Sequence, residues 1–381
     1  EFSNNLLEKA KPAAIKEFEN LENYAKKIDE IDQLQKWDGA YYSEKLKKEL
    51  FDLDQELLKP YFKLENVIDG AFQIAEKLFG LQFEEVQNID TYHQDVKTYR
   101  VVDDSSNLVA VFYADFFPRA GKRNGAWMTS YKPQYIKNKE NSRPHISIVC
   151  NFTKPTKTKP SLLTFNEVTT LFHEFGHALH GMLANTTYPS LSGTSVFWDF
   201  VELPSQVMEN WCYEKEALEL FATHYETGEV IPMELVEKIK DSATFHEGMQ
   251  TLRQLSLGLL DMSWHSQDPT SIKSVKTYED DVFKNTSLYP KTKETCMSTS
   301  FSHIFQGGYS SGYYSYKWAE VLDADAFEYF KQEGIFNKMV ADKFKNHVLS
   351  QGGTENPMTL YKRFRGQEPQ PEALLRRAGL I

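Results

Sequence analysis

The sequence is poor in cysteine, with only three among its 381 residues. Cys150, Cys212 and Cys296 are widely spaced, no Cys-x-x-Cys pair occurs, and the odd number argues against a disulfide framework. Free thiols are typical of a reducing compartment, so we predict a cytoplasmic protein. No signal peptide is visible. Since the first residue is Glu1 rather than Met, we expect a fragment or a processed product.

Long apolar runs and an excess of basic residues are also lacking. No apolar stretch approaches the length of a membrane span, so we expect no membrane partner. The formal net charge is -11 and no basic stripe occurs, which argues against a nucleic-acid partner. In contrast, 41% of the residues are hydrophobic and 14% are aromatic. This composition is sufficient for a large core in one or two domains.

Most of the chain shows the apolar spacing of helices. A central part differs, because β-branched and aromatic residues predict strands at residues 97–102, 108–116 and 145–152. The polar residues 103–107 form a turn, so the first two strands should pair as a hairpin. We therefore predict a mainly α-helical protein with a small antiparallel sheet. The sheet either covers the helix described next or holds an extended peptide at an exposed edge.

The most informative stretch is Leu-Phe-His-Glu-Phe-Gly-His-Ala-Leu-His at residues 171–180, which contains a His-Glu-x-x-His motif. On a helix, His173 and His177 lie one turn apart on the same face. They can share one metal ion, and Glu174 can reach a water beside it. The alternative is an ordinary amphipathic helix with two surface histidines. Residues 164–167 read as a capping box, whereas Gly176 costs the helix about 1 kcal/mol relative to Ala. We therefore expect another segment to approach the backbone there.

A catalytic zinc ion needs three protein ligands and one open position. Glu202 lies on the next expected helix, so the sequence predicts one zinc ion per chain, bound by His173, His177 and Glu202. Alternatively, Glu202 is a carboxylate that stabilises a helix start. Asp199 and Glu209 either orient the imidazoles or lie on a solvated face. We favour the solvated face for Asp199 and leave Glu209 open.

Together these motifs resemble the thimet oligopeptidase family of zinc metallopeptidases. The resemblance is carried by HEFGH at 173–177, ELPSQVMENW at 202–211, FSHIFQGGY at 301–309, GYYSY at 312–316, GAWM at 125–128 and YKRFRGQEP at 361–369. The last run is most similar to bacterial oligopeptidases A, and peptidyl-dipeptidases share most of these motifs. The resemblance covers nearly the whole chain from about Trp37 and matches the C-terminal catalytic part of longer family members. Their N-terminal region would form much of one wall of a deep substrate channel.

The resemblance implies a zincin-type helical metallopeptidase that hydrolyses short, unfolded peptides, with Glu174 as general base. Tyr309 and Tyr316 correspond to tyrosines that contact the scissile carbonyl, and His303 to a substrate-binding histidine. A phenol O–H can indeed donate to a developing oxyanion. The alternative for tyrosines 313, 314 and 316 is packing on a helix face, and we hold to packing for Tyr314.

Other functions stay open at this point. The chain is a zinc endopeptidase, a peptidyl-dipeptidase that releases C-terminal dipeptides, or a peptide-binding chain that is inactive without its missing N-terminal region. We expect short peptides as substrates, and either a monomer or a chain that pairs with that missing region. We divide the chain into residues 1–245 with the zinc-binding helices, 246–342 with the Gly/Tyr substrate loop, and 343–381 as a C-terminal helical tail that packs on the catalytic region.

Overall fold

The computed structural model describes residues 2–381, which pack as two compact units. Unit 1 combines the segment that ends at Leu53 with Lys238–Val321 and Pro371–Ile381. Unit 2 comprises Asp54–Glu237 and Leu322–Gln370. The three-part division expected from the sequence stays a prediction.

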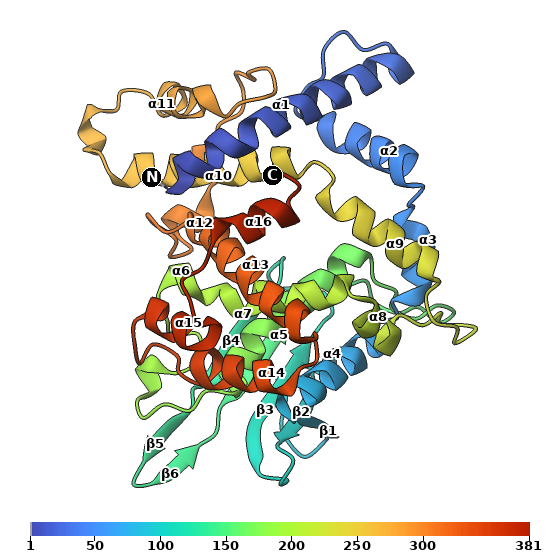
Figure 1. The fold of residues 1–381 in the computed structure, drawn as a ribbon, viewed down its shortest axis with the longest axis vertical. Helices are drawn as coiled ribbons and strands as arrows, with labels where there is room; N and C mark the ends of the chain where they lie inside the picture. Colours follow the sequence, from blue (N-terminus) through green and yellow to red (C-terminus); the bar gives the residue numbers. More distant parts are fainter. Residues whose placement is uncertain (1) are drawn as a thin grey trace. The chain divides into compact units, whose positions relative to one another are not determined.

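Unit 2 is built around a five-stranded sheet with the strand order β1-β2-β3-β7-β4 (Figure 1). The strands are β1 Gln82–Val86, β2 Lys97–Val102, β3 Leu108–Asp115, β4 Trp127–Lys132 and β7 His145–Val149. A separate hairpin pairs β5 Tyr135–Lys137 with β6 Glu140–Ser142. The expected β2–β3 hairpin is confirmed. In its turn, the Asp103 carboxylate accepts the N–H groups of Ser105 and Asn107, each at 2.9 Å.

The sheet is mixed, so the expectation of a wholly antiparallel sheet needs correction. Strands β3 and β7 run parallel, with Val111 opposite His145. Between them the chain forms β4, β5 and β6, and this long connection returns β7 in the direction of β3. Strands β1 and β4, the two edge strands, were not predicted from the sequence. Both are short and partly exposed, so neither shows the apolar pattern of a buried strand.

Helices α4 Leu64–Phe79 and α5 Phe165–Met182 pack against this sheet. Four phenylalanines fill the space between them: Phe72 stacks on Phe83 with a centroid separation of 3.9 Å, and Phe112 meets Phe175 edge-on at 6.2 Å. Aromatic pairs of this kind add to the gain from apolar burial. The other helices of unit 2 are α3 Gln55–Leu58, α6 Trp198–Val201, α7 Leu203–Glu209, α8 Lys215–Phe221, α14 Lys338–Phe344, a π-helical turn at Lys345–Leu349 and α15 Pro357–Arg365.

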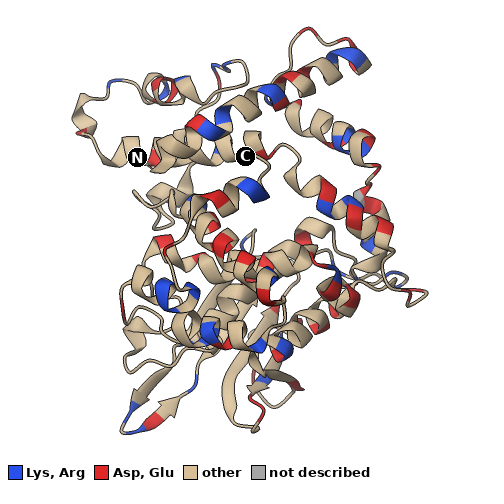
Figure 2. Ribbon diagram, viewed as in Figure 1, with Lys and Arg blue, Asp and Glu red and all other residues tan. Residues whose placement is uncertain are grey.

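Unit 1 is helical, and its longest helix α1 Phe2–Asp29 packs along α10 Glu247–His265. Its other helices are α2 Gly39–Phe51, α11 Val275–Val282, α12 Ser302–Phe305 and α16 Pro371–Arg377, while α9 Met233–Asp241 and α13 Ser315–Glu333 cross the boundary between the units. Among the described helices, none combines the length and apolar content that a membrane span requires. Figure 2 shows basic and acidic residues interspersed along the helices of both units. The expected mainly helical fold class is confirmed.

Candidate metal centre

Helix α5 carries the His-Glu-x-x-His motif, and a reciprocal capping box begins it. The Glu167 N–H donates to Thr164 Oγ1 at 3.2 Å, and the Thr164 N–H donates to the Glu167 carboxylate at 2.8 Å. A cap of this kind typically stabilises a helix by about 1 kcal/mol. Within the helix, the His173 and His177 rings lie 4.9 Å apart. The local sequence therefore places both imidazoles on one face.

Gly176 allows α7 to approach α5 closely. A Cβ atom at this position would lie 2.4 Å from the Pro204 carbonyl oxygen and 2.6 Å from Ser205 Cα. The close approach expected from this mid-helix glycine is confirmed. Because Glu202 lies at the junction of α6 and α7, this packing brings its side chain to the histidine pair.

The three predicted metal ligands converge in unit 2. Glu202 Oε2 lies 3.3 Å from His173 Nε2 and 3.1 Å from His177 Nε2, and the ligand atoms all lie within 4.8 Å of one another. Ligands at zinc bond lengths in a tetrahedron are separated by about 3.3–3.6 Å. The spacing and the donor set of two imidazoles and one carboxylate therefore fit a zinc ion.

Glu202 does not act as a helix cap, although it occupies the N-cap position of α7. Its side chain forms no capping hydrogen bond. Instead, Oε2 accepts the Ser205 hydroxyl at 2.9 Å and faces the two imidazoles. Burial opposes ionisation of this carboxyl, but the hydrogen bonds with His173 and His177 outweigh burial and hold its pKa far below the usual value. The geometry therefore favours the ligand interpretation.

Glu209 contacts the other side of the first histidine. Its Oε1 lies 2.7 Å from His173 Nδ1, so an Nδ1–H can donate to the carboxylate while Nε2 faces Glu202. A carboxylate that accepts the N–H of the second ring nitrogen orients a metal-bound histidine. Burial disfavours the charged imidazole, but the hydrogen bonds to Glu202 and Glu209 outweigh it and raise the pKa of His173 well above the usual value. For Asp199, which is partly buried on α6, the solvated-face interpretation stays a prediction.

Glu174 and His180 are both buried, but in different settings. Glu174 is 6% exposed, and its Oε2 has no hydrogen-bond partner among residues 2–381. Burial raises the pKa of this carboxyl, against the opposing effect of the two histidines. A buried carboxylate oxygen with no protein partner is available to a water or a substrate. Burial lowers the pKa of His180 to about 3, so this ring is neutral.

The other predicted site residues lie together in unit 1. His303 belongs to α12, Tyr309 lies in the following loop, and Tyr316 lies in the first turn of α13. The Tyr309 and Tyr316 rings stack with centroids 5.2 Å apart, and His303 lies 6.2 Å from Tyr309. Tyr313, for which the sequence left packing on a helix face open, also joins this cluster, and its ring centroid lies 5.2 Å from that of Tyr316. Tyr314 is partly buried near Gly258 of α10.

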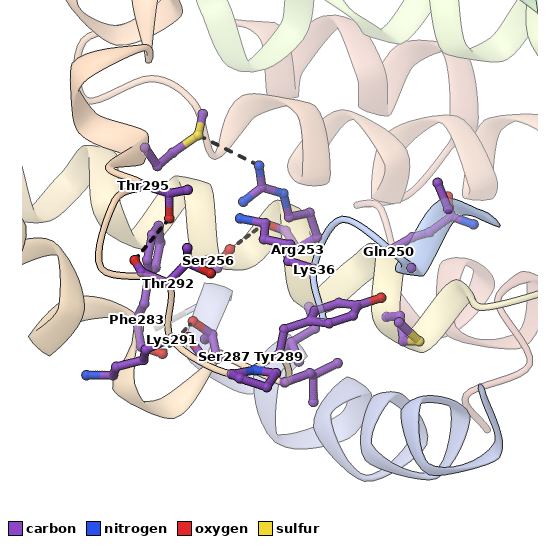
Figure 3. A pocket seen from close by; sticks show the side chains of 18 of the residues that line it. Lys36, Gln250, Arg253, Ser256, Phe283, Ser287, Tyr289, Lys291, Thr292 and Thr295 are labelled. Carbon is purple, nitrogen blue, oxygen red and sulfur yellow. Dashed lines mark hydrogen bonds between the residues drawn. The ribbon is translucent and has the colours of Figure 1, made fainter. Parts of the chain in front are cut away.

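Unit 1 also contains a hollow of about 750 Å³ that no motif indicated. Figure 3 shows Lys36 and Arg253 directed into it, with the Tyr289 ring below them. Burial, together with repulsion from Arg253, lowers the pKa of Lys36. The walls come from α2, α10 and residues 276–300. Because these segments are far apart in the chain, sequence spacing could not reveal the hollow.

Comparison with known proteins identifies the family. The profile of peptidase family M3 matches residues 1–380. The chain belongs to peptidase family M3. This M3 chain is 42% identical over 384 residues to oligopeptidase A of Escherichia coli (strain K12). The aligned region covers 100% of the chain and 56% of that protein.

Two further M3 relatives bear different names. Organellar oligopeptidase A of Arabidopsis thaliana is 42% identical, over 99% of the chain and 50% of that protein. Dipeptidyl carboxypeptidase of E. coli (strain K12) is 39% identical, over 91% of the chain and 51% of that protein. The M3 chain thus spans about half the length of the curated relatives it matches.

A solved structure shares the fold. M32 carboxypeptidase from Deinococcus radiodurans R1 aligns with a TM-score of 0.51 and 14% identity, over 98% of this chain and 74% of that chain. At this identity the likeness concerns the fold alone. The helical metallopeptidase fold and the family expected from the sequence are both confirmed.

Proposed function

We propose that this chain is the catalytic part of a zinc oligopeptidase that hydrolyses peptide bonds in short, unfolded peptides. The observation that carries this proposal is the convergence of His173, His177 and Glu202 beside the buried Glu174. Membership of peptidase family M3 and relatives named oligopeptidase A support it. A cytoplasmic location and a monomer that binds short peptides belong to the same proposal.

His173, His177 and Glu202 would hold the ion, and Glu209 would keep the His173 ring in the orientation that turns Nε2 toward Glu202. Bound zinc would supply Lewis acidity to the scissile carbonyl and to water. Glu174 would accept a proton from the attacking water and deliver it to the nitrogen of the leaving amine. Its burial favours this exchange, because a desolvated carboxylate binds a proton more readily than an exposed one.

The tyrosine cluster would complete the chemistry. The hydroxyls of Tyr309 and Tyr316 would donate to the oxygen that becomes negative as the carbonyl is attacked, and His303 would contact the substrate. Tyr316 lies in a formed helix and Tyr309 in a loop. We therefore assign Tyr316 as a fixed donor and Tyr309 as one that moves when the loop closes.

Two alternatives have their own support. The 39% identity to a protein named dipeptidyl carboxypeptidase favours release of C-terminal dipeptides. The short span relative to the relatives favours a chain that binds zinc and peptide but requires a further region for turnover.

One experiment separates these functions. A peptide with a free C-terminus and the same peptide with an amidated C-terminus are incubated with the purified chain. Products are identified by mass spectrometry, and zinc is measured in the same sample. We expect about one zinc per chain and internal cleavage of both peptides. Dipeptides from the free-acid peptide alone would indicate the dipeptidase, and zinc without products would indicate the dependent chain.

The metal site has its own control in this experiment. His177→Ala should lose the zinc, whereas His347→Ala, on the π-helical turn, should keep it. Full zinc retention in His177→Ala would exclude α5 as the metal site.

A further inference from the structure

One buried carboxylate holds the loop that carries Tyr309. Asp261 lies on α10 with no exposed surface. Its Oδ1 accepts the Ser311 N–H at 2.9 Å, and its Oδ2 accepts the Tyr313 N–H at 2.9 Å. The Nδ1 atom of His265, one turn further along α10, lies 2.9 Å from the Asp261 carbonyl oxygen and 2.8 Å from Asp261 Oδ1. Two backbone N–H groups of the loop therefore donate to one buried carboxylate, and the His265 ring lies beside it.

The backbone at this point adopts a conformation that needs outside support. Ser311 has a φ of 57°, in the left-handed region that side chains other than glycine rarely adopt. This conformation costs roughly 1–2 kcal/mol for an L-residue and persists only where surrounding contacts impose it. The hydrogen bond from the Ser311 N–H to Asp261 is such a contact. Asp261 therefore stabilises a turn that the sequence of the loop alone does not favour.

Both halves of the loop are held by hydrogen bonds, and in the first half the N–H groups of Gln306 and Gly307 donate to the Ser302 carbonyl at 2.7 and 2.9 Å. Residues 305–308 are exposed, and Gly308 adopts a φ of 86°. In the second half, the Gly312 N–H donates to the Tyr309 carbonyl at 2.8 Å, and the Tyr313 ring meets Phe301 edge-on at 5.0 Å. The second half thus joins Tyr309 to the turn that Asp261 holds.

We propose that Asp261 is a positioning residue for the tyrosine pair. By fixing the turn at residues 311–313, which lies between Tyr309 and Tyr316, it sets the backbone that follows Tyr309 and precedes the first turn of α13 with Tyr316. His265 contributes through its Nδ1 atom, which lies close to both the main-chain carbonyl and the carboxylate of Asp261. This inference rests on the proposed function, because the pair matters only if its hydroxyls assist peptide hydrolysis.

Asp261→Asn tests the inference by replacing one carboxylate oxygen with an NH₂ group. The amide keeps one acceptor oxygen, but its NH₂ group must face a donor, so at least one N–H loses its partner. We expect kcat to fall by roughly 10–100-fold with KM changed less than about threefold, the pattern of a group needed in the transition state. Zinc content should equal that of the parent. Amide hydrogen exchange of a peptic fragment covering residues 306–314 should become faster.

Two other variants complete the test. His265→Phe keeps a ring against Phe305 but removes the donor, and it should show the same pattern with a smaller fall in kcat, even if Asp261→Asn folds poorly. Asp268→Asn is the matched control. It lies on the surface, where its carboxylate accepts the Thr270 N–H at 2.9 Å, and it should match the parent in turnover and in exchange of the loop.

The outcomes are distinct. Parent-like exchange of the loop in Asp261→Asn overturns the inference, and so does parent-like kcat in an active chain. Faster exchange supports the role of Asp261 in holding the turn even if the parent hydrolyses no peptide. A parent chain that hydrolyses no peptide would count against the proposed function and not against the role of Asp261.

Discussion

At the scale of single residues, Glu174 provides the sharpest test of the mechanism. Glu174→Gln keeps the shape of the side chain but cannot accept a proton. Zinc should stay bound, and turnover should fall by at least about 100-fold, the usual scale for a general base. Product formation is measured on the same peptides, with Glu216→Gln on the exposed side of α8 as the control. Near-normal hydrolysis by Glu174→Gln, with contaminating peptidases excluded, would contradict the mechanism.

Tyr316 and Tyr314 offer a matched pair of hydroxyl deletions. Tyr316→Phe removes a proposed oxyanion donor and leaves the stacked ring in place. We expect a loss of about 10²–10³ in kcat with little change in KM, whereas Tyr314→Phe should be nearly silent. Steady-state kinetics on one peptide decides between them. Equal activity of the two variants in a competent enzyme would show that the oxyanion donor lies elsewhere.

The burial of His246 should make the free energy of unfolding sensitive to acid pH. Burial lowers its pKa to about 4, whereas the unfolded value is about 6.5. Between these values the unfolded chain binds more protons, so the free energy of unfolding should fall as pH drops through this window. His246→Asn should make the free energy of unfolding less dependent on pH in this window, and Asn tolerates the left-handed backbone at φ 58°. Urea unfolding of parent and variant at about pH 7 and about pH 4.5 measures the difference. An identical pH dependence would contradict the prediction.

At the scale of elements, the crossing of α5 and α7 positions the metal ligands. In Gly176→Ala, the new Cβ would lie 2.4 Å from a backbone oxygen of α7, so the helices must separate. We expect a loss of about 1–3 kcal/mol in stability and weaker zinc binding, because Glu202 would move away from the histidines.

The control for this change is a helical glycine with room around it. In α10, a Cβ at Gly258 would meet its nearest atom at 3.7 Å, an ordinary contact. Gly258→Ala should therefore be neutral, or more stable by up to about 1 kcal/mol through its higher helix propensity. Thermal unfolding with a zinc titration measures both variants. Parent-like zinc affinity in Gly176→Ala would show that the close approach does not position Glu202.

At the scale of the whole molecule, the expected substrate is an extended, flexible chain. If a channel of the kind implied by the family surrounds the site, short peptides should be cut and a stably folded protein should stay intact. The measurement compares peptide products with gel analysis of a folded protein under the same conditions. If a further region is essential, the chain should bind zinc and show little turnover. Rapid digestion of the folded protein would contradict both forms of the prediction.

Local sequence by itself determined the helix of the candidate site. The spacing of His173 and His177, the capping box at its start and the cost of Gly176 are all set within one or two helical turns, so the sequence alone predicted them. The candidate ligand Glu202 was found because zinc sites need a third donor. The hairpin of β2 and β3 likewise depends only on a short turn between two β-rich segments.

Tertiary structure decided the features that join distant segments. Glu209 meets His173 across 36 positions, Asp261 meets Ser311 across 50, and β7 pairs in parallel with β3 after a long connection. No local pattern encodes these contacts. The sequence around a single carboxylate on a helix does not show whether the side chain faces water or a backbone N–H. They follow from packing that brings the elements together, and burial then makes each polar group take the partner within reach.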